Sequence, residues 1–251
     1  MVTHRVVTRE DWIRERLQHL TREKEFTRLR DQLSAERREL PWVKVDKPYA
    51  FDGPGGPQSL SDLFQGRSQL IVYHFMFDPS WDEGCKSCSF WMDNFDGTDV
   101  HLNHRDVSLV LVSRAPIAIL EAYRKRMGWR LSWMSSEHND FNRDYHVSFS
   151  REELESGQAY YNYRHGSFPV GEAPGISVFY RDTDGTIYHT YSCYARGLDM
   201  LNASYHLLDL VPKGRDEAGL PNSMAWLRHH DRYDGRPLVP VGSLRGGRPT
   251  Q

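Results

Sequence analysis

The chain has 251 residues and is nearly neutral, with 32 Lys and Arg residues against 34 Asp and Glu residues. This balance gives no strong attraction to nucleic acid or to a membrane surface. Hydrophobic residues make up 39% and aromatic residues 12%, which suits a packed core and excludes a disordered chain. No apolar run approaches the roughly 20 residues of a membrane span, and the charged start lacks an apolar signal segment. Three cysteines are too few for a disulfide scaffold, and we expect a cytoplasmic protein.

Residues 8–38 have the pattern of a long helix. Thr8 is placed to cap it, and Pro41 closes it. Large apolar residues recur at roughly helical spacing and charges fill the remaining positions. We therefore expect an N-terminal helical extension over residues 1–41, packed on a domain or on a second subunit, which leaves a homo-oligomer open.

A strand, a loop, two cysteines and a helix then follow one another. Residues 70–77 form an apolar run rich in β-branched and aromatic residues, which predicts a buried strand. Pro79 and Gly84 break the next stretch into a loop. The sequence CKSC begins at Cys85, and the residues after it can wind as a helix.

Cys85 is thus expected at or near a helix N-terminus. Unpaired backbone N–H groups and the helix dipole lower the pKa of a thiol at that position. Cys88 lies about one turn later and can close a disulfide with Cys85. The pair has the makings of a dithiol redox site, with Cys85 as the nucleophile and Cys88 as the resolving thiol.

The middle of the chain continues the alternation of strands and helices. Residues 107–113 are a second apolar run and predict a second strand of a parallel sheet. Pro116 opens a helix that ends at Gly128. Residues 129–149 are expected to be mostly loop with a short strand at the start. Residues 150–171, which include an acidic helix and a tyrosine-rich patch, are interpreted as an irregular insertion.

The last elements are a hairpin and a helix. Residues 175–181 predict a third strand, which a turn joins to a returning strand at 186–191, at the edge of the sheet. Residues 197–210 are expected to form a terminal helix. Residues 212–251 are rich in Gly, Pro and charge and are expected to be a partly mobile C-terminal extension, with a mobile last dozen residues.

This element order predicts the fold class. Two strands each followed by a helix, then a hairpin and a closing helix, give an α/β protein with a thioredoxin-like three-layer fold and a mixed central sheet. We assign this domain to residues 42–211, with the N-terminal helical extension and the irregular insertion added to it. Reactive groups in such sheets lie beyond the carboxyl ends of the strands, where Cys85 falls.

The chain resembles the thioredoxin and peroxiredoxin superfamily in residues 59–77, which a loop and a cysteine follow. At finer grain it is similar to the bacterial thioredoxin-like family known as domain-of-unknown-function family 899. The resemblance extends over residues 4–233 and includes LPWVKVDKPYAFDGP, GCKSCSFWMDNFDG, APGISVFYRD and YARGLDMLNASYHLLDLVPKGR. It implies a thioredoxin-like fold and carries no assigned activity. The loop before Cys85 has no threonine, unlike the PxxxTxxC pattern of peroxiredoxins, which disfavours simple peroxidase chemistry.

Two further residues are candidates for substrate binding. Trp81 stands close to the cysteines and is expected to line a substrate groove. Arg114 directly follows the second strand, at the same sheet edge as Cys85, where it can stabilise a thiolate or an anionic substrate. Pairing with an aspartate is its other interpretation. The third cysteine, Cys193, is interpreted as a small, half-buried residue after the hairpin.

We therefore predict a thiol–disulfide oxidoreductase that acts on a protein or small-molecule thiol or disulfide, with a redox-active disulfide and no other cofactor. Nucleic acid and membranes are not expected as partners. A zinc- or copper-binding module is the alternative, with Cys85, Cys88 and a histidine as ligands. His74 lies inside the buried strand and is interpreted as a core histidine. A third hypothesis is a scaffold whose aromatic surface binds a partner.

Overall fold

The computed structural model describes residues 4–233 of the chain. The chain divides into two compact units, residues 1–42 and residues 43–251, each of which is described by itself. Among the described residues, no helix combines the length and the apolar character needed to cross a membrane.

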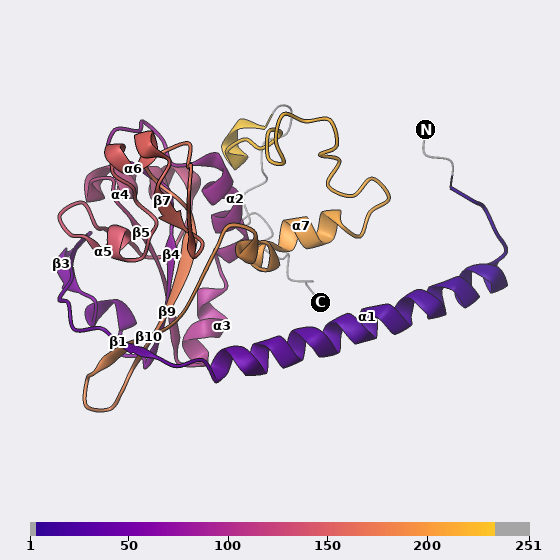
Figure 1. Cartoon of the computed structure of the whole chain (residues 1–251), viewed down its shortest axis with the longest axis horizontal. Coiled ribbons are helices and arrows are strands. Elements are labelled where there is room, and N and C mark those ends of the chain that lie inside the picture. The colour runs from indigo at the N-terminus through magenta and orange to yellow at the C-terminus, as the bar shows by residue number, and fades with distance from the viewer. Residues whose placement is uncertain (1–3, 234–251) are drawn as a thin grey trace, which may run out of the picture. The chain divides into compact units, whose positions relative to one another are not determined.

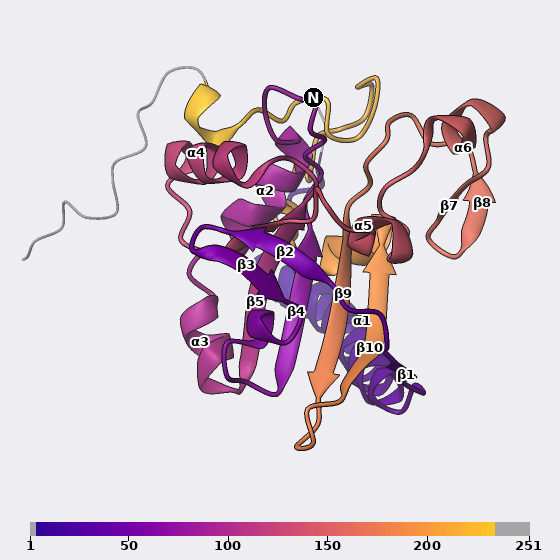
Figure 2. The ribbon, with the colours of Figure 1, turned by 90° about the vertical axis from the view of Figure 1, so that its left-hand side faces the viewer.

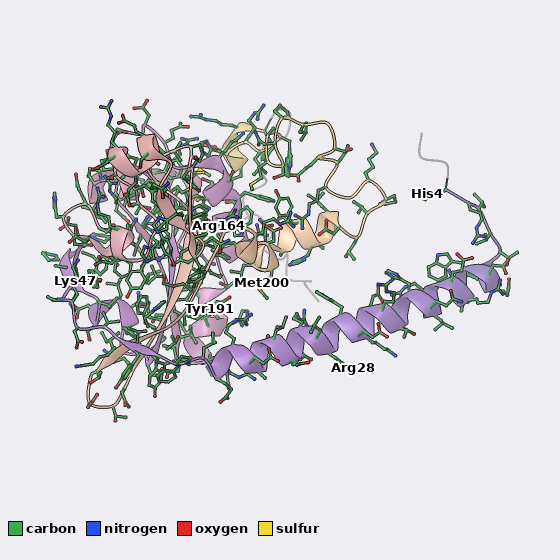
Figure 3. All side chains as sticks on the ribbon, viewed as in Figure 1. His4, Arg28, Lys47, Arg164, Tyr191 and Met200 are labelled. Carbon is green, nitrogen blue, oxygen red and sulfur yellow. The ribbon has the colours of Figure 1, made fainter. Side chains whose placement is uncertain are left out.

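The first unit is built around one helix, α1 (Arg9–Arg38). The hydroxyl of Thr8 accepts a hydrogen bond from the backbone N–H of Asp11 at 3.1 Å, which is the expected cap. Acidic residues in the first turn and Arg37 and Arg38 in the last turn complement the helix dipole. No residue of α1 is buried, and Figure 3 shows its side chains, Arg28 among them, projecting around the helix. Capping and complementary charges therefore stabilise the two ends of this helix.

The second unit is organised around an eight-stranded mixed sheet (Figure 2). Strands β4 (Gln69–His74) and β5 (Val107–Ser113) run parallel at its centre. Strand β9 (Gly175–Arg181) lies antiparallel to β4, and β10 (Ile187–Tyr194) returns beside β9. The full order is β1-β10-β9-β4-β5-β6-β2-β3, where β1 is Val43–Lys44, β2 is Ala50–Gly53, β3 is Gly56–Ser59 and β6 is Trp133–Ser135.

Alternating side chains of the central strands build a core on each face of the sheet. On one face, Tyr73 and Leu111 pack in a cluster with residues of three helices. These helices are α2 (Lys86–Phe95), α4 (Ile117–Met127) and α7 (Ala203–Leu208). This face is the larger and more aromatic of the two cores, and it holds the side chain of Cys88.

On the other face, Val72 and Val112 pack with the short helices η1 (Asp62–Phe64) and α5 (Phe141–Asp144). The sheet is thus covered on both sides, as a three-layer α/β fold requires. Along the chain, β4, α2, β5, α4, β9, β10 and α7 follow the thioredoxin order, with the central strands arranged β10-β9-β4-β5. The predicted thioredoxin-like fold class is confirmed.

The insertion is more regular than expected. It contains α6 (Arg151–Ser156) and a separate two-stranded sheet of β7 (Ala159–Tyr161) and β8 (Arg164–Gly166). Helix α5 lies before it, within residues 129–149, which were expected to be mostly loop. Figure 2 shows α6, β7 and β8 gathered together beside the main sheet. A capping box between Ser150 and Glu153 starts α6, as its acidic first turn indicated. The structure also adds α3 (Asp99–His104), which was not expected.

Two expectations near the end of this unit are corrected. Strand β10 runs on to Tyr194, beyond the expected end at residue 191. Its pairing with β9 shifts between His189 and Tyr191, which interrupts the alternation of the sequence, and then continues to Tyr194. Strand β1 pairs outside β10, so the hairpin is not the edge of the sheet. The expected terminal helix is divided into η2 (Ala195–Leu201) and α7, because Asn202 between them caps α7 by accepting from the N–H of Tyr205.

Candidate functional site

Cys85 lies at the junction between the loop after β4 and helix α2, where it is the N-cap residue. Its backbone N–H donates to the carbonyl of Met76 at 3.1 Å, which ties the loop back to the end of the strand region. Its own carbonyl accepts from the N–H and the hydroxyl of Ser89, both at 2.9 Å. The cysteine is half-buried, and these bonds fix its backbone at the start of the helix.

The loop can reach this position because residue 84 is a glycine. A Cβ on Gly84 would lie 2.7 Å from a ring carbon of Phe75 and 3.0 Å from a ring carbon of Tyr123. Both rings are buried in the core beneath α2 and α4. The loop therefore packs its backbone directly on aromatic rings, and Cys85 follows at the next residue.

The two thiols differ in acid strength. The pKa of Cys85 is lowered to about 6, first by the hydrogen bond from the Cys88 side chain and further by the backbone N–H groups of Cys88 and Ser87, against the effect of burial. The pKa of Cys88 is raised, first by its burial and then by the adjacent Cys85. Both cysteines are free thiols in the structure. At neutral pH the arrangement therefore favours a Cys85 thiolate that accepts a hydrogen bond from a Cys88 thiol.

Cys88 is held in the aromatic core on the inner side of α2, where 1% of its surface is exposed. The backbone N–H of Met76 donates to its sulfur at 3.4 Å. The hydroxyl of Tyr73 also interacts with this sulfur and partly opposes the rise in the pKa of Cys88. The second thiol of the motif is thus positioned by the strand region before the loop.

Arg114, a predicted substrate-binding residue, is held by two carboxylates. Its Nη1 donates to Oε1 of Glu172 at 3.0 Å, and its Nη2 lies 3.9 Å from Oδ2 of Asp78. This is the pairing that sequence analysis gave as the other interpretation of Arg114, with Glu172 as an additional partner. The arginine joins the start of the loop before Cys85 to the segment before β9.

Glu172 is a residue that sequence analysis missed. Its side chain is 1% exposed, and it accepts from the hydroxyl of Ser148 at 2.8 Å as well as from Arg114. Burial raises its pKa to about 7, against the lowering effect of Arg114. No local signal marks this glutamate, because it stands alone in an aperiodic stretch and its partners are distant in the sequence.

Trp81, the other predicted substrate-binding residue, lies in the loop between Asp78 and Gly84. Its backbone N–H donates to the carbonyl of Asp78 at 3.0 Å, and its half-buried ring packs against the core that contains Cys88. A role of Trp81 in a substrate groove stays a prediction.

The histidines and the third cysteine take other positions. Nε2 of His74 bonds with the hydroxyl of Ser177 at 2.9 Å inside the sheet, as expected for a core histidine. Cys193 lies on β10 and packs against the core below α2. Within residues 4–233, no three side chains from His, Cys, Asp and Glu are arranged to hold a metal ion.

The C-terminal segment of residues 212–233, here called the strap, lies against the site; Figure 1 shows it in yellow beside α2. The amino group of Lys86 donates to the carbonyl of Ala225 at 3.4 Å. Nε2 of His229 bonds with the carbonyl of Gly84, directly before Cys85, at 2.9 Å. Leu227 is fully buried. The mobility expected of the last dozen residues falls outside the described part of the chain.

Ion pairs also fasten the strap to the loop and to α4. Arg126 of α4 bonds with Asp231 and with Glu83, each at 2.8 Å. Arg232 of the strap pairs with Glu83 as well. Glu83 stands two residues before Cys85, so the strap, the loop and α4 form one charged network around the reactive cysteine.

The strand order and the two cysteines at the start of α2 define a protein of the thioredoxin-like class. The chain belongs to the family described as "Bacterial protein of unknown function (DUF899)", whose model matches residues 1–233. A search of curated proteins finds no match.

Similar solved structures include peroxidoxin BcpB from Mycobacterium tuberculosis, with 12% identity and a TM-score of 0.44 over 66% of this chain and 95% of that chain. Peroxiredoxin Q from Xanthomonas campestris has 13% identity and a TM-score of 0.42 over 67% and 96%. DsbE from Chlorobium tepidum, a candidate thiol:disulfide interchange protein, has 12% identity and a TM-score of 0.38 over 66% and 97%.

Proposed function

We propose that this protein is a thiol–disulfide oxidoreductase in which Cys85 attacks and Cys88 resolves. The observation that carries the proposal is the placement of the two thiols: Cys85 is half-buried at the N-cap of α2, and Cys88 is enclosed in the core one turn later. The lowered pKa of Cys85 and the raised pKa of Cys88 agree with this placement. A nucleophile must be ionised to attack, whereas a resolving thiol must stay protonated until the mixed disulfide has formed. The first turn of α2 provides both an acidic thiol at Cys85 and a protonated thiol at Cys88.

The reaction follows from these protonation states. The Cys85 thiolate attacks one sulfur of a substrate disulfide, forms a mixed disulfide and releases the other substrate sulfur as a thiolate. Cys88 then gives up its proton and attacks the sulfur of Cys85, which releases the second substrate thiolate. The substrate gains two electrons and the protein keeps a Cys85–Cys88 disulfide. A dithiol reductant restores the two thiols. Glu172 and Arg114 have no assigned step in this sequence.

The proposal includes a cytoplasmic location. A reducing compartment returns such a disulfide to the dithiol form, and a CxxC pair in that setting is more often catalytic or metal-binding than structural. The partners are then a thiol or disulfide substrate, either a protein or a small molecule, and a reductant of the dithiol class.

The deciding experiment measures the redox midpoint of the Cys85–Cys88 pair together with the metal content of the same preparation. A metal-free protein with a midpoint between about −270 and −120 mV would support the proposal. The Cys88→Ser variant should accumulate a mixed disulfide at Cys85, and Cys85→Ser should form none. One equivalent of zinc or copper that is lost in Cys85→Ser would contradict the proposal in favour of a metal site.

A further inference from the structure

A cavity of about 270 Å³ is lined by Ser87 and Cys88 on the first turn of α2, directly after Cys85. Its floor contains Tyr73 of β4 and Cys88 of α2, and the wall is completed by Trp91 of α2 and Leu198 of η2. The strap adds Met224 on the outer side. Four segments that are distant in the sequence therefore meet around a space that borders Cys88, the second thiol of the motif.

The charged groups of the cavity wall all have partners in the protein: the two arginines form ion pairs with aspartates, and Glu217 accepts hydrogen bonds from neutral donors. The guanidinium of Arg215 bonds with both carboxylate oxygens of Asp209 at 2.8 Å and with Asp199 at 3.3 Å. Oε1 of Glu217 accepts from the hydroxyl of Tyr205 at 3.2 Å. The same oxygen accepts from the indole N–H of Trp226 at 2.8 Å, and Arg196 pairs with Asp199 at 2.9 Å.

Pairing of this kind leaves the cavity suited to an uncharged ligand. Two arginines and two carboxylates lie in its wall, so the wall has no net formal charge, and the remaining wall is mostly aliphatic, aromatic and sulfur-containing. A charged ligand would have to displace one of these ion-pair or hydrogen-bond partners, whereas an apolar group gains from leaving water. Apolar cavities of roughly 150 Å³ hold a benzene ring, so this one has room for a ring with a short chain.

The strap also bears on the size of the substrate. It covers the loop before Cys85 through the bond between His229 and Gly84, and the start of α2 through the bond between Lys86 and Ala225. The strap thus contacts the residues on both sides of Cys85 in the sequence, which leaves less room for a folded protein than for a small molecule. A small molecule bound in the cavity would lie against Cys88, three residues after Cys85 at the start of α2.

We propose that the cavity binds the apolar arm of a small, uncharged disulfide and presents the disulfide bond of that molecule to Cys85. This assignment rests on the proposed thiol–disulfide exchange and adds a substrate class to it. The bonds made and broken are those of that exchange. The apolar arm occupies the cavity beside Cys88 during the first attack and leaves with its thiol after Cys88 has closed the protein disulfide.

A matched pair of strap variants tests the assignment. Ser223 lines the cavity and is exposed, so Ser223→Trp should fold and fill the cavity mouth. Its neighbour Asn222 is exposed and is not part of the cavity wall, so Asn222→Trp is the control. Pre-reduced protein is mixed with lipoamide, an uncharged disulfide with an apolar arm, or with oxidised glutathione, which is charged. The rate of disulfide reduction is followed by mass spectrometry after acid quenching.

We expect Ser223→Trp to lower the lipoamide rate by about tenfold or more and to change the glutathione rate by less than about twofold. Asn222→Trp should leave both rates near those of the wild type. Because each variant is compared with the wild type on the same disulfide, differences in intrinsic reactivity cancel. An equal effect of Ser223→Trp on both disulfides, or no effect on lipoamide, would overturn the assignment.

A second measurement separates the cavity from the redox chemistry. The amide 5-cyclopentylpentanamide has carbon in place of both sulfurs of lipoamide, and its binding is measured by calorimetry. The wild type and Asn222→Trp should bind it and Ser223→Trp should not. Failure of the wild type to bind refutes the cavity site even if the dithiol is redox-active. Binding by a protein that reduces neither disulfide refutes the proposed function, and the substrate assignment falls with it.

Discussion

Cys85 and Cys88 are chemically the same side chain in two different surroundings. Cys85 is half-buried at the N-terminal end of α2, with backbone N–H groups directed at it, whereas Cys88 is enclosed by the aromatic core. The first environment stabilises a negative charge and the second disfavours one. The different roles proposed for the two thiols follow from their positions: Cys85 is at the N-cap of α2, and Cys88 lies three residues later, inside the core.

The hydrogen bond from Cys88 is the first cause of the low pKa of Cys85, so its removal should be visible in the reactivity of Cys85. Cys88→Ala should raise the pKa of Cys85 above about 6, whereas Cys88→Ser keeps an O–H donor and should raise it less. The measurement is the rate of alkylation of Cys85 by iodoacetamide as a function of pH. Cys193→Ala is the control and should leave the profile unchanged. Identical profiles for Cys88→Ala and the wild type would contradict the assigned cause.

Glu172 should make stability depend on pH. Its pKa is raised from 4.5 to about 7 by burial, so its contribution to stability is complete below the unfolded pKa and is lost as pH rises through about 7. Relative to Glu172→Gln, the free energy of unfolding of the wild type should fall by roughly 3 kcal/mol between about pH 4 and pH 8. Urea unfolding at both pH values measures this. Glu152→Gln, at an exposed position of α6, should give a constant difference.

At the scale of elements, the site depends on how closely the loop after β4 packs on the core. Helix α2 begins directly after that loop. Cys85 is its N-cap residue, and Cys88 lies in its first turn. The backbone of Gly84 rests on Phe75 and Tyr123, and the carbonyl of Met76 accepts from Cys85. The position of the Cys85 sulfur is therefore set by contacts of the backbone with aromatic rings.

Gly84→Ala should disturb this packing. Its new methyl group would lie 2.7 Å from Phe75, so either the ring or the loop must move. Overpacking of this kind typically costs about 1–3 kcal/mol, and the movement of the loop should also raise the pKa of Cys85 by weakening its hydrogen bonds. Gly55→Ala is the control, because a Cβ there meets nothing within 4 Å. Equal stability of the two variants in urea would show that the loop absorbs the methyl group without cost.

At the scale of the whole second unit, the strap links the C-terminal part of the chain to the dithiol. Leu227 is its fully buried anchor, and its ion pairs reach the loop and α4. Exposed ion pairs contribute little to stability, so the burial of the leucine is expected to dominate the free energy of docking.

Leu227→Ala should loosen the strap without unfolding the domain. The loss of buried side-chain volume costs about 2–5 kcal/mol and should fall on strap docking, because the strap follows the last helix of the thioredoxin-like core. We expect faster proteolysis within residues 212–233 and several-fold faster alkylation of Cys85. Leu220→Ala, at a 37% exposed position of the strap, should change neither. A uniform loss of stability in urea with no local proteolysis would refute this account.

Local patterns in the sequence were sufficient for the elements of the core. The apolar runs of β4 and β5, the cap at Thr8, and the cysteines at a strand–helix junction each depend on residues close together in the chain. Periodicity and capping report such short-range relations well. Where a pairing shift interrupts the pattern, as in β10, the same reasoning placed the end of the strand too early.

The sequence by itself determined the fold class and the position of the dithiol, because both follow from element order and local chemistry. Only the tertiary structure decided that Arg114 pairs with Glu172, that the strap reaches Gly84, and that Cys88 borders a cavity. Each of these contacts joins residues far apart in the chain. No local pattern encodes such contacts, because they exist only after the sheet has brought its loops to one edge and the C-terminal segment has packed across α2.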